Sequence, residues 1–104
     1  MNIFDYLRDK YPEVNKSLTT GAVNAFFRSY IGRGNMANVP SLVKPGDFFD
    51  VLAEKSDEEL LTLRNMGINK VRFLRKALKD WDEEMGIERN ESMLHIRNVQ
   101  VYDL

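Results

Sequence analysis

Residues 64–79 read RNMGINKVRFLRKALK, and this stretch decides the fold. It holds six basic residues and no acidic one, and Gly67 separates two segments whose apolar residues recur at helical spacing. The pattern predicts a helix, a glycine turn and a second helix. Residues 47–59 and 80–91 flank it with six acidic residues and one basic residue each. A patch of positive charge beside a tight turn favours phosphate binding at that place.

The longest helix is predicted over about residues 69–85. Its apolar residues alternate at spacings of three and four, which predicts a buried seam of Val71, Leu74, Leu78, Trp81 and Met85. The basic residues lie off this seam, and we expect all five to be solvated: Lys70, Arg72, Arg75, Lys76 and Lys79. Gly86 is expected to cap the helix, and Gly67 is expected to adopt a positive φ.

Shorter helices are predicted on the N-terminal side of the turn. Ser56 and Glu59 form a capping-box pattern, which starts a short helix, and another helix is expected over about residues 47–53. Thr19 or Thr20 can cap a helix that ends near Ile31. An opening helix carries Phe4, Leu7 and Tyr11 on one face and is interrupted by Pro12.

The C-terminal end has a different pattern. Residues 93–102 alternate apolar and polar residues, and we expect an extended arm that packs back on the domain rather than pairing with a second copy. The expected fold is therefore all-α, a compact bundle of about five short helices with an extended C-terminal tail. Residues 1–17 would form an N-terminal helical extension, residues 18–86 the core and residues 87–104 the arm.

Composition excludes several classes of site. The chain has 104 residues, which suits one domain, and it has no cysteine, so disulfides, zinc thiolates and cysteine nucleophiles are excluded. The single histidine, His95, has no partner for a metal site. No catalytic triad, phosphate-binding glycine loop or pair of catalytic carboxylates is recognisable. We expect a cytoplasmic non-enzyme without cofactor, metal, signal peptide or membrane span.

The order of segments carries a resemblance. Residues 18–26 read LTTGAVNAF, residues 46–52 read GDFFDVL and residues 56–67 read SDEELLTLRNMG, followed by a helix through Leu78. Over residues 18–86 this series resembles the C-terminal domain of the bacterial RNA polymerase alpha subunit. The resemblance implies a compact all-helical domain with a helix-hairpin-helix, which binds the DNA minor groove and transcription factors.

The resemblance also implies site residues. Asn24 matches the DNA-contacting asparagine of the family and Gly67 matches the hairpin glycine, whereas Gly21 stands where the family has its principal arginine. Arg33, between two glycines in the following loop, is a candidate to replace that arginine, and the alternative is that this loop is a plain connector. With the basic helix face, the expected nucleic-acid-binding residues are Asn24, Arg33, Gly67, Asn69, Lys70, Arg72, Arg75 and Lys76.

Two functions remain open at this point. The first is a DNA-binding or transcription-associated module that contacts duplex phosphates weakly through the hairpin and a basic helix face. The alternative is a protein–protein interaction module that docks a partner such as RNA polymerase or another transcription protein. The basic block, residues 64–79, and Asn24 favour the first function. The glycine at position 21 in place of the family's arginine, and a pI near 5.8, favour the second. In either case we expect a monomer more than a dimer.

Overall fold

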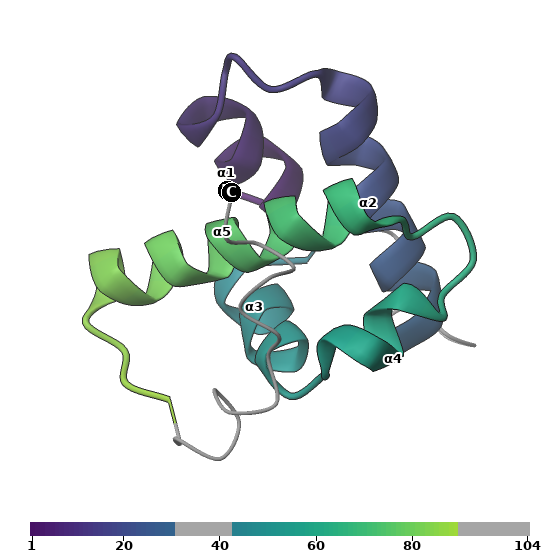
Figure 1. Ribbon diagram of the computed structural model, residues 1–104. Coiled ribbons are helices and arrows are strands. Elements are labelled where there is room, and N and C mark those ends of the chain that lie inside the picture. Colours follow the sequence, from purple (N-terminus) through teal and green to yellow (C-terminus); the bar gives the residue numbers. More distant parts are fainter. Residues whose placement is uncertain (31–42, 90–104) are drawn as a thin grey trace.

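Five α-helices form the part of the chain that the computed structural model describes, residues 1–30 and 43–89 (Figure 1). No strand occurs among these residues, so the expected all-α class is confirmed for them. Arg33 and the expected arm over residues 93–102 lie outside the described residues. In chain order the helices are α1 (Ile3–Lys10), α2 (Lys16–Tyr30), α3 (Pro45–Ala53), α4 (Asp57–Leu61) and α5 (Ile68–Met85).

Polar side chains cap several of the helices. Ser56 and Glu59 form the complete capping box predicted for α4, and Gly86 ends α5 with φ 68°. The expectation that Thr19 or Thr20 caps α2 is wrong. Helix α2 begins at Lys16, because the Asn15 side chain already accepts the Ser17 N–H at 2.7 Å.

Helix α5 is the central element of the core. In Figure 1, α1 and the first part of α2 lie above α5, and α3 and α4 lie below it. The predicted seam is confirmed at Val71, Leu74 and Leu78, which are fully buried. Trp81 is partly buried and stacks on a phenylalanine of α3. The expectation that Met85 continues the seam is wrong: this side chain is 49% exposed, in a last turn that extends beyond the covering helices (Figure 1).

Helix α1 closes the same core. Ile3 and Leu7 are fully buried, and the Ile3 N–H donates to the Val43 carbonyl at 2.8 Å. The Tyr11 hydroxyl, just after α1, donates to Asp80 of α5 at 2.6 Å. Residues 1–17 therefore share one hydrophobic core with the helices that follow.

A further tie lies just after α5. The Arg89 guanidinium donates to both carboxylate oxygens of Asp82, at 3.0 and 2.8 Å, and to Asp50 of α3 at 2.9 Å. Arg89 is thus 12% exposed and holds the segment after Gly86 against α3.

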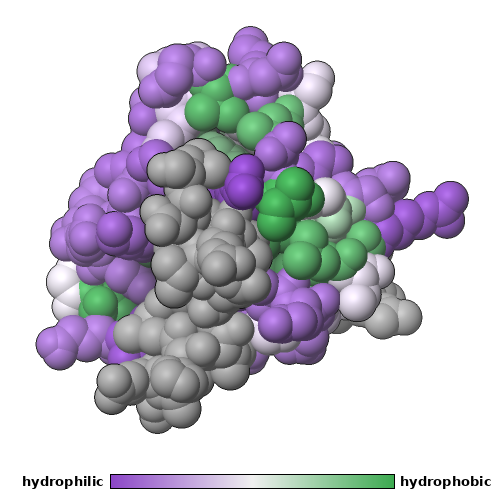
Figure 2. All heavy atoms as spheres, in the orientation of Figure 1, coloured by the Kyte–Doolittle hydropathy of each residue, from purple (hydrophilic) through white to green (hydrophobic). Residues whose placement is uncertain are grey.

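The surface is predominantly polar in the view of Figure 2, with small apolar clusters between hydrophilic side chains. Leu61 and Ile68 are the exposed large apolar residues nearest the α4–α5 turn, at 41% and 40% exposure. No helix within residues 1–30 and 43–89 has the length and apolar character needed to cross a membrane.

Candidate nucleic-acid interface

The α4–α5 turn differs from expectation in one backbone angle. Gly67 has φ −91° and ψ 177°, an extended conformation that any residue adopts, so the expected positive φ is wrong. Gly67 instead caps α5, and its carbonyl accepts the Val71 N–H at 3.1 Å. Asn65 takes the left-handed conformation, with φ 65°, which asparagine tolerates better than most residues. The chain therefore reverses at Asn65 and starts α5 at Gly67.

The start of α5 is a polar, solvent-accessible edge. The N–H groups of Ile68, Asn69 and Lys70 precede the first intrahelical hydrogen bond of α5. Gly67 and Asn69 are exposed beside them. The helix dipole places partial positive charge at this edge, so an anion is stabilised there.

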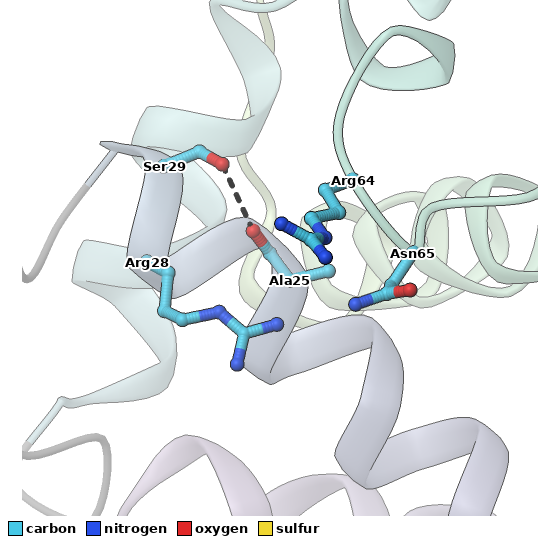
Figure 3. Close-up of a pocket in the computed structure, with 5 residues that line it drawn as sticks. All are labelled: Ala25, Arg28, Ser29, Arg64 and Asn65. Carbon is cyan, nitrogen blue, oxygen red and sulfur yellow. Dashed lines mark hydrogen bonds between the residues drawn. The ribbon is translucent and has the colours of Figure 1, made fainter.

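A hollow opens between the second half of α2 and the α4–α5 turn (Figure 3). The side chains of Arg28 and Arg64 point into it from opposite elements, and Asn65 flanks them. Among the described residues, neither arginine has a hydrogen-bond or ion-pair partner, and both are exposed. Two exposed guanidinium groups beside one hollow attract an anion to it. We call this site, formed by Ala25, Arg28, Ser29, Arg64 and Asn65, the cationic hollow.

Lys70 lies between the turn and α2. Its Nζ donates to the Asn65 carbonyl at 2.7 Å. It also passes close to Gly21, where a Cβ atom would lie 3.0 Å from both Cε and Nζ of Lys70. Lys70 therefore bridges the turn and the glycine face of α2.

A second hollow adjoins the first and is more apolar. Leu18 of α2 faces the turn there, together with Leu63, Met66 and Ile68, and Asn65 lines both hollows. Ile68 leaves much of its side chain accessible. The turn thus presents a cationic side and an apolar side that meet at Asn65.

The remaining predicted residues are distributed unevenly. Asn24 is half-buried on α2, one helical turn before Arg28, and so lies on the same face as the hollow. Lys76 instead pairs with Asp80 at 3.0 Å, and its ammonium lies over the Tyr11 ring near α1. Arg72 is half-buried. Asn69 and Lys70 therefore lie at the turn, Asn24 lies on the α2 face that carries Arg28, and Lys76 lies near α1.

Arg75 contradicts the expectation of a solvated phosphate contact. Its side chain is fully buried and forms an ion pair with Asp57, Nε to Oδ1 at 2.7 Å. It also donates to the carbonyls of Leu52 and Lys55, at the end of α3 and just before α4. A buried guanidinium needs such acceptors, because desolvation without them costs several kcal/mol. Arg75 joins α3, α4 and α5 and does not reach the surface.

Sequence reasoning missed Arg28 and Arg64 as candidate site residues. Arg28 follows Asn24 by four residues and Gly21 by seven, a spacing that places all three on one face of a helix. This spacing is the sequence signal that could have identified Arg28 as a site residue. Arg64 opens the basic block, but its approach to α2 depends on the reversal at Asn65.

The other end of the molecule pairs its charges. The Tyr11 hydroxyl and Lys76 both donate to the Asp80 carboxylate. Burial raises the pKa of Tyr11, and its bond to Asp80 raises it further. Partial burial acts to raise the pKa of Asp80, but hydrogen bonds from Tyr11 and Lys76 outweigh it and hold that pKa below its ordinary value. These interactions attach α1 to α5.

No cluster of three acidic or histidine side chains suited to a metal ion occurs within the described ranges. Comparison of the chain with protein-family models, with curated proteins and with solved structures finds no match.

Proposed function

We propose that this chain is a non-enzymatic DNA-binding module that contacts duplex phosphates through the cationic hollow and the start of α5. The observation that carries the proposal is the convergence of Arg28 and Arg64 on one hollow without an acidic partner in the described chain. Guanidinium groups bind phosphate oxygens in bidentate geometry, and their charge attracts a polyanion.

Neighbouring groups complete a phosphate-binding surface. The N–H groups at the start of α5 and the amides of Asn65 and Asn69 supply neutral donors beside the arginines. Asn24 lies on the α2 face that carries Arg28. The surface is small, so binding is weak and depends strongly on salt.

The resemblance to the RNA polymerase alpha C-terminal domain supports a transcription-associated role in the cytoplasm. The expected pair of helices around a turn corresponds to α4 and α5, and Asn24 lies on the helix that faces this turn. The proposed surface differs from that family in using Arg28 and Arg64, because Gly21 replaces the arginine. The assignment of α4, the turn and α5 as a helix-hairpin-helix rests on the same features.

The test is fluorescence anisotropy of a labelled DNA duplex over a salt series. We expect Arg28→Ala with Arg64→Ala to weaken binding at low salt about tenfold or more, and to lower the slope of log K against log salt by roughly two, because two phosphate contacts are lost. The matched control, Lys44→Ala with Lys79→Ala, removes the same charge from two exposed lysines that line neither hollow.

Two results would count against the proposal. Wild-type protein that binds no duplex at low salt would remove DNA as the ligand. An equal loss in both double variants would show that net charge, and not the cationic hollow, determines binding.

Protein docking is the second candidate function. The exposed side chains of Leu61 and Ile68, on either side of the turn, favour it, since exposed large apolar residues often mark contact surfaces. For a transcription protein such as RNA polymerase, we expect Leu61→Ser with Ile68→Ser to abolish co-purification, and we expect Leu61→Ser alone, which lies outside the start of α5, to weaken it while the DNA affinity stays unchanged. Co-purification that survives this change would exclude this surface as the docking site.

A further inference from the structure

Gly21 lies in the interior of α2, five residues after its first residue, Lys16. Glycine weakens a helix interior, because it loses the most backbone freedom on folding. No turn or positive φ requires glycine here, since the only glycine with positive φ in the described chain is Gly86. The missing Cβ at Gly21 must therefore serve another purpose.

Lys70 occupies the space beside Gly21. A Cβ at position 21 would lie 3.0 Å from Cε and Nζ of Lys70, which is tighter than most contacts of a Cβ atom, so the end of Lys70 would have to move by a few tenths of an ångström. Without that Cβ, the ammonium reaches the Asn65 carbonyl and donates to it at 2.7 Å. An alanine at position 21 would therefore shift the end of Lys70 and weaken this bond.

Asn65 is the residue that this bond fixes. It has the left-handed φ of 65°, a conformation with a cost for a residue with a Cβ. It also lines both hollows and is the immediate neighbour of Arg64. The orientation of Arg64 toward Arg28 therefore depends on the backbone that Lys70 holds.

We propose that Gly21 and Lys70 form a positioning device for the phosphate-binding surface: Gly21 supplies the space, and Lys70 holds Asn65 so that Arg64 faces Arg28. This inference rests on the proposed function. Lys70 acts here through Asn65, in contrast to the direct phosphate contact expected from the sequence.

Gly21→Ala is the decisive variant, because it keeps every charge. We expect its Tm to rise by roughly 2–5 °C through the higher helix propensity of alanine. We also expect its affinity for duplex DNA to fall about threefold, because the charged hydrogen bond from Lys70 to Asn65 is weakened. If Gly21 affected only stability, the Tm and the DNA affinity of Gly21→Ala would change in the same direction.

A second measurement needs no DNA. In Lys70→Met, and in Gly21→Ala, we expect amide hydrogen exchange of Met66, whose N–H donates to the Leu63 carbonyl at 3.2 Å, to accelerate about fivefold or more, because the turn opens more often. The control is Lys79→Met, an exposed lysine on the same helix, which should leave exchange at the turn unchanged.

The outcomes separate the two proposals. Loss of DNA binding in the Arg28 and Arg64 variant with wild-type affinity in Gly21→Ala would overturn the positioning device alone. Unchanged exchange in both Gly21→Ala and Lys70→Met would also overturn it, whether or not DNA binds. A wild-type protein without DNA affinity would overturn the proposed function, and exchange at the turn would then decide the positioning of Asn65.

Discussion

Two arginine environments in this protein invite comparison. At the junction of α3, α4 and α5, Arg75 is fully buried, and its donors meet the Asp57 carboxylate and two carbonyl oxygens. In the cationic hollow, Arg28 and Arg64 are exposed and have no such partners among the described residues. The first environment fixes three helices, whereas the second leaves donors available to a ligand. Paired charge here maintains the fold, whereas the two unpaired arginines are the residues that we propose contact DNA.

The largest effect is expected at the paired arginine. Asp57→Ala leaves the Arg75 guanidinium buried without its counter-charge, so we expect the free energy of unfolding to fall by about 3–5 kcal/mol in urea denaturation. The control is Glu58→Ala, which changes an exposed acid in the same helical turn and should cost far less. Similar losses in both variants would mean that the Arg75 pair is no more important than a surface charge.

At the α4–α5 turn, a valine at position 65 should destabilise the protein more than a valine at position 67. Asn65→Val places a β-branched residue at φ 65°, and we expect a loss of about 1–2 kcal/mol in thermal or urea unfolding. Gly67→Val should cost only about 0.5 kcal/mol, because φ −91° suits valine and nothing lies within 4 Å of the added Cβ. A larger loss for Gly67→Val would restore the original expectation of a strained glycine.

The paired end of α5 allows a pH test. Tyr11→Phe removes a hydrogen bond to Asp80, and we expect a loss of about 1 kcal/mol at neutral pH. The lowered pKa of Asp80 contributes stability above its ordinary value of 3.8, and this contribution is lost as the pH falls through the lower folded value. The stability difference between wild type and Tyr11→Phe should therefore shrink below about pH 4. A constant difference across the titration would exclude this coupling.

The smallest change in stability is expected in the cationic hollow. Arg28→Ala with Arg64→Ala removes two exposed cations that have no ion-pair partner among the described residues, so unfolding free energy should stay within about 0.5 kcal/mol of wild type. Urea denaturation at low salt measures it. A loss comparable to that of Asp57→Ala would show that these arginines support the fold, and the contrast between the two environments would fail.

Local sequence signals predicted much of the fold. The Ser56–Glu59 box and the Val71, Leu74 and Leu78 seam depend on residues three or four apart, and each was recognised correctly. The start of α2 was missed, since the Asn15 cap was overlooked in favour of the two threonines.

Prediction of the site required contacts between residues that are distant in the sequence. Arg75 follows Asp57 by eighteen residues, so their pairing could not be predicted from sequence. The spacing of Arg75, four residues after Val71 and three before Leu78, places it beside the buried seam, unlike Lys76, which faces solvent. The proximity of Arg64 to Arg28 likewise requires the turn to pack against α2. The sequence therefore located the basic segment and Asn24, but the assignment of each cation to core or surface needed the tertiary structure.

The contacts of Arg89 set a practical boundary for producing this domain. A shortened protein that ends at Gly86, where the helical core was expected to stop, would lack the guanidinium that joins Asp82 to Asp50. Both carboxylates would then lose their shared counter-ion at the junction of α3 and α5. Expression of the domain for crystallisation or NMR should therefore extend through Arg89 at least.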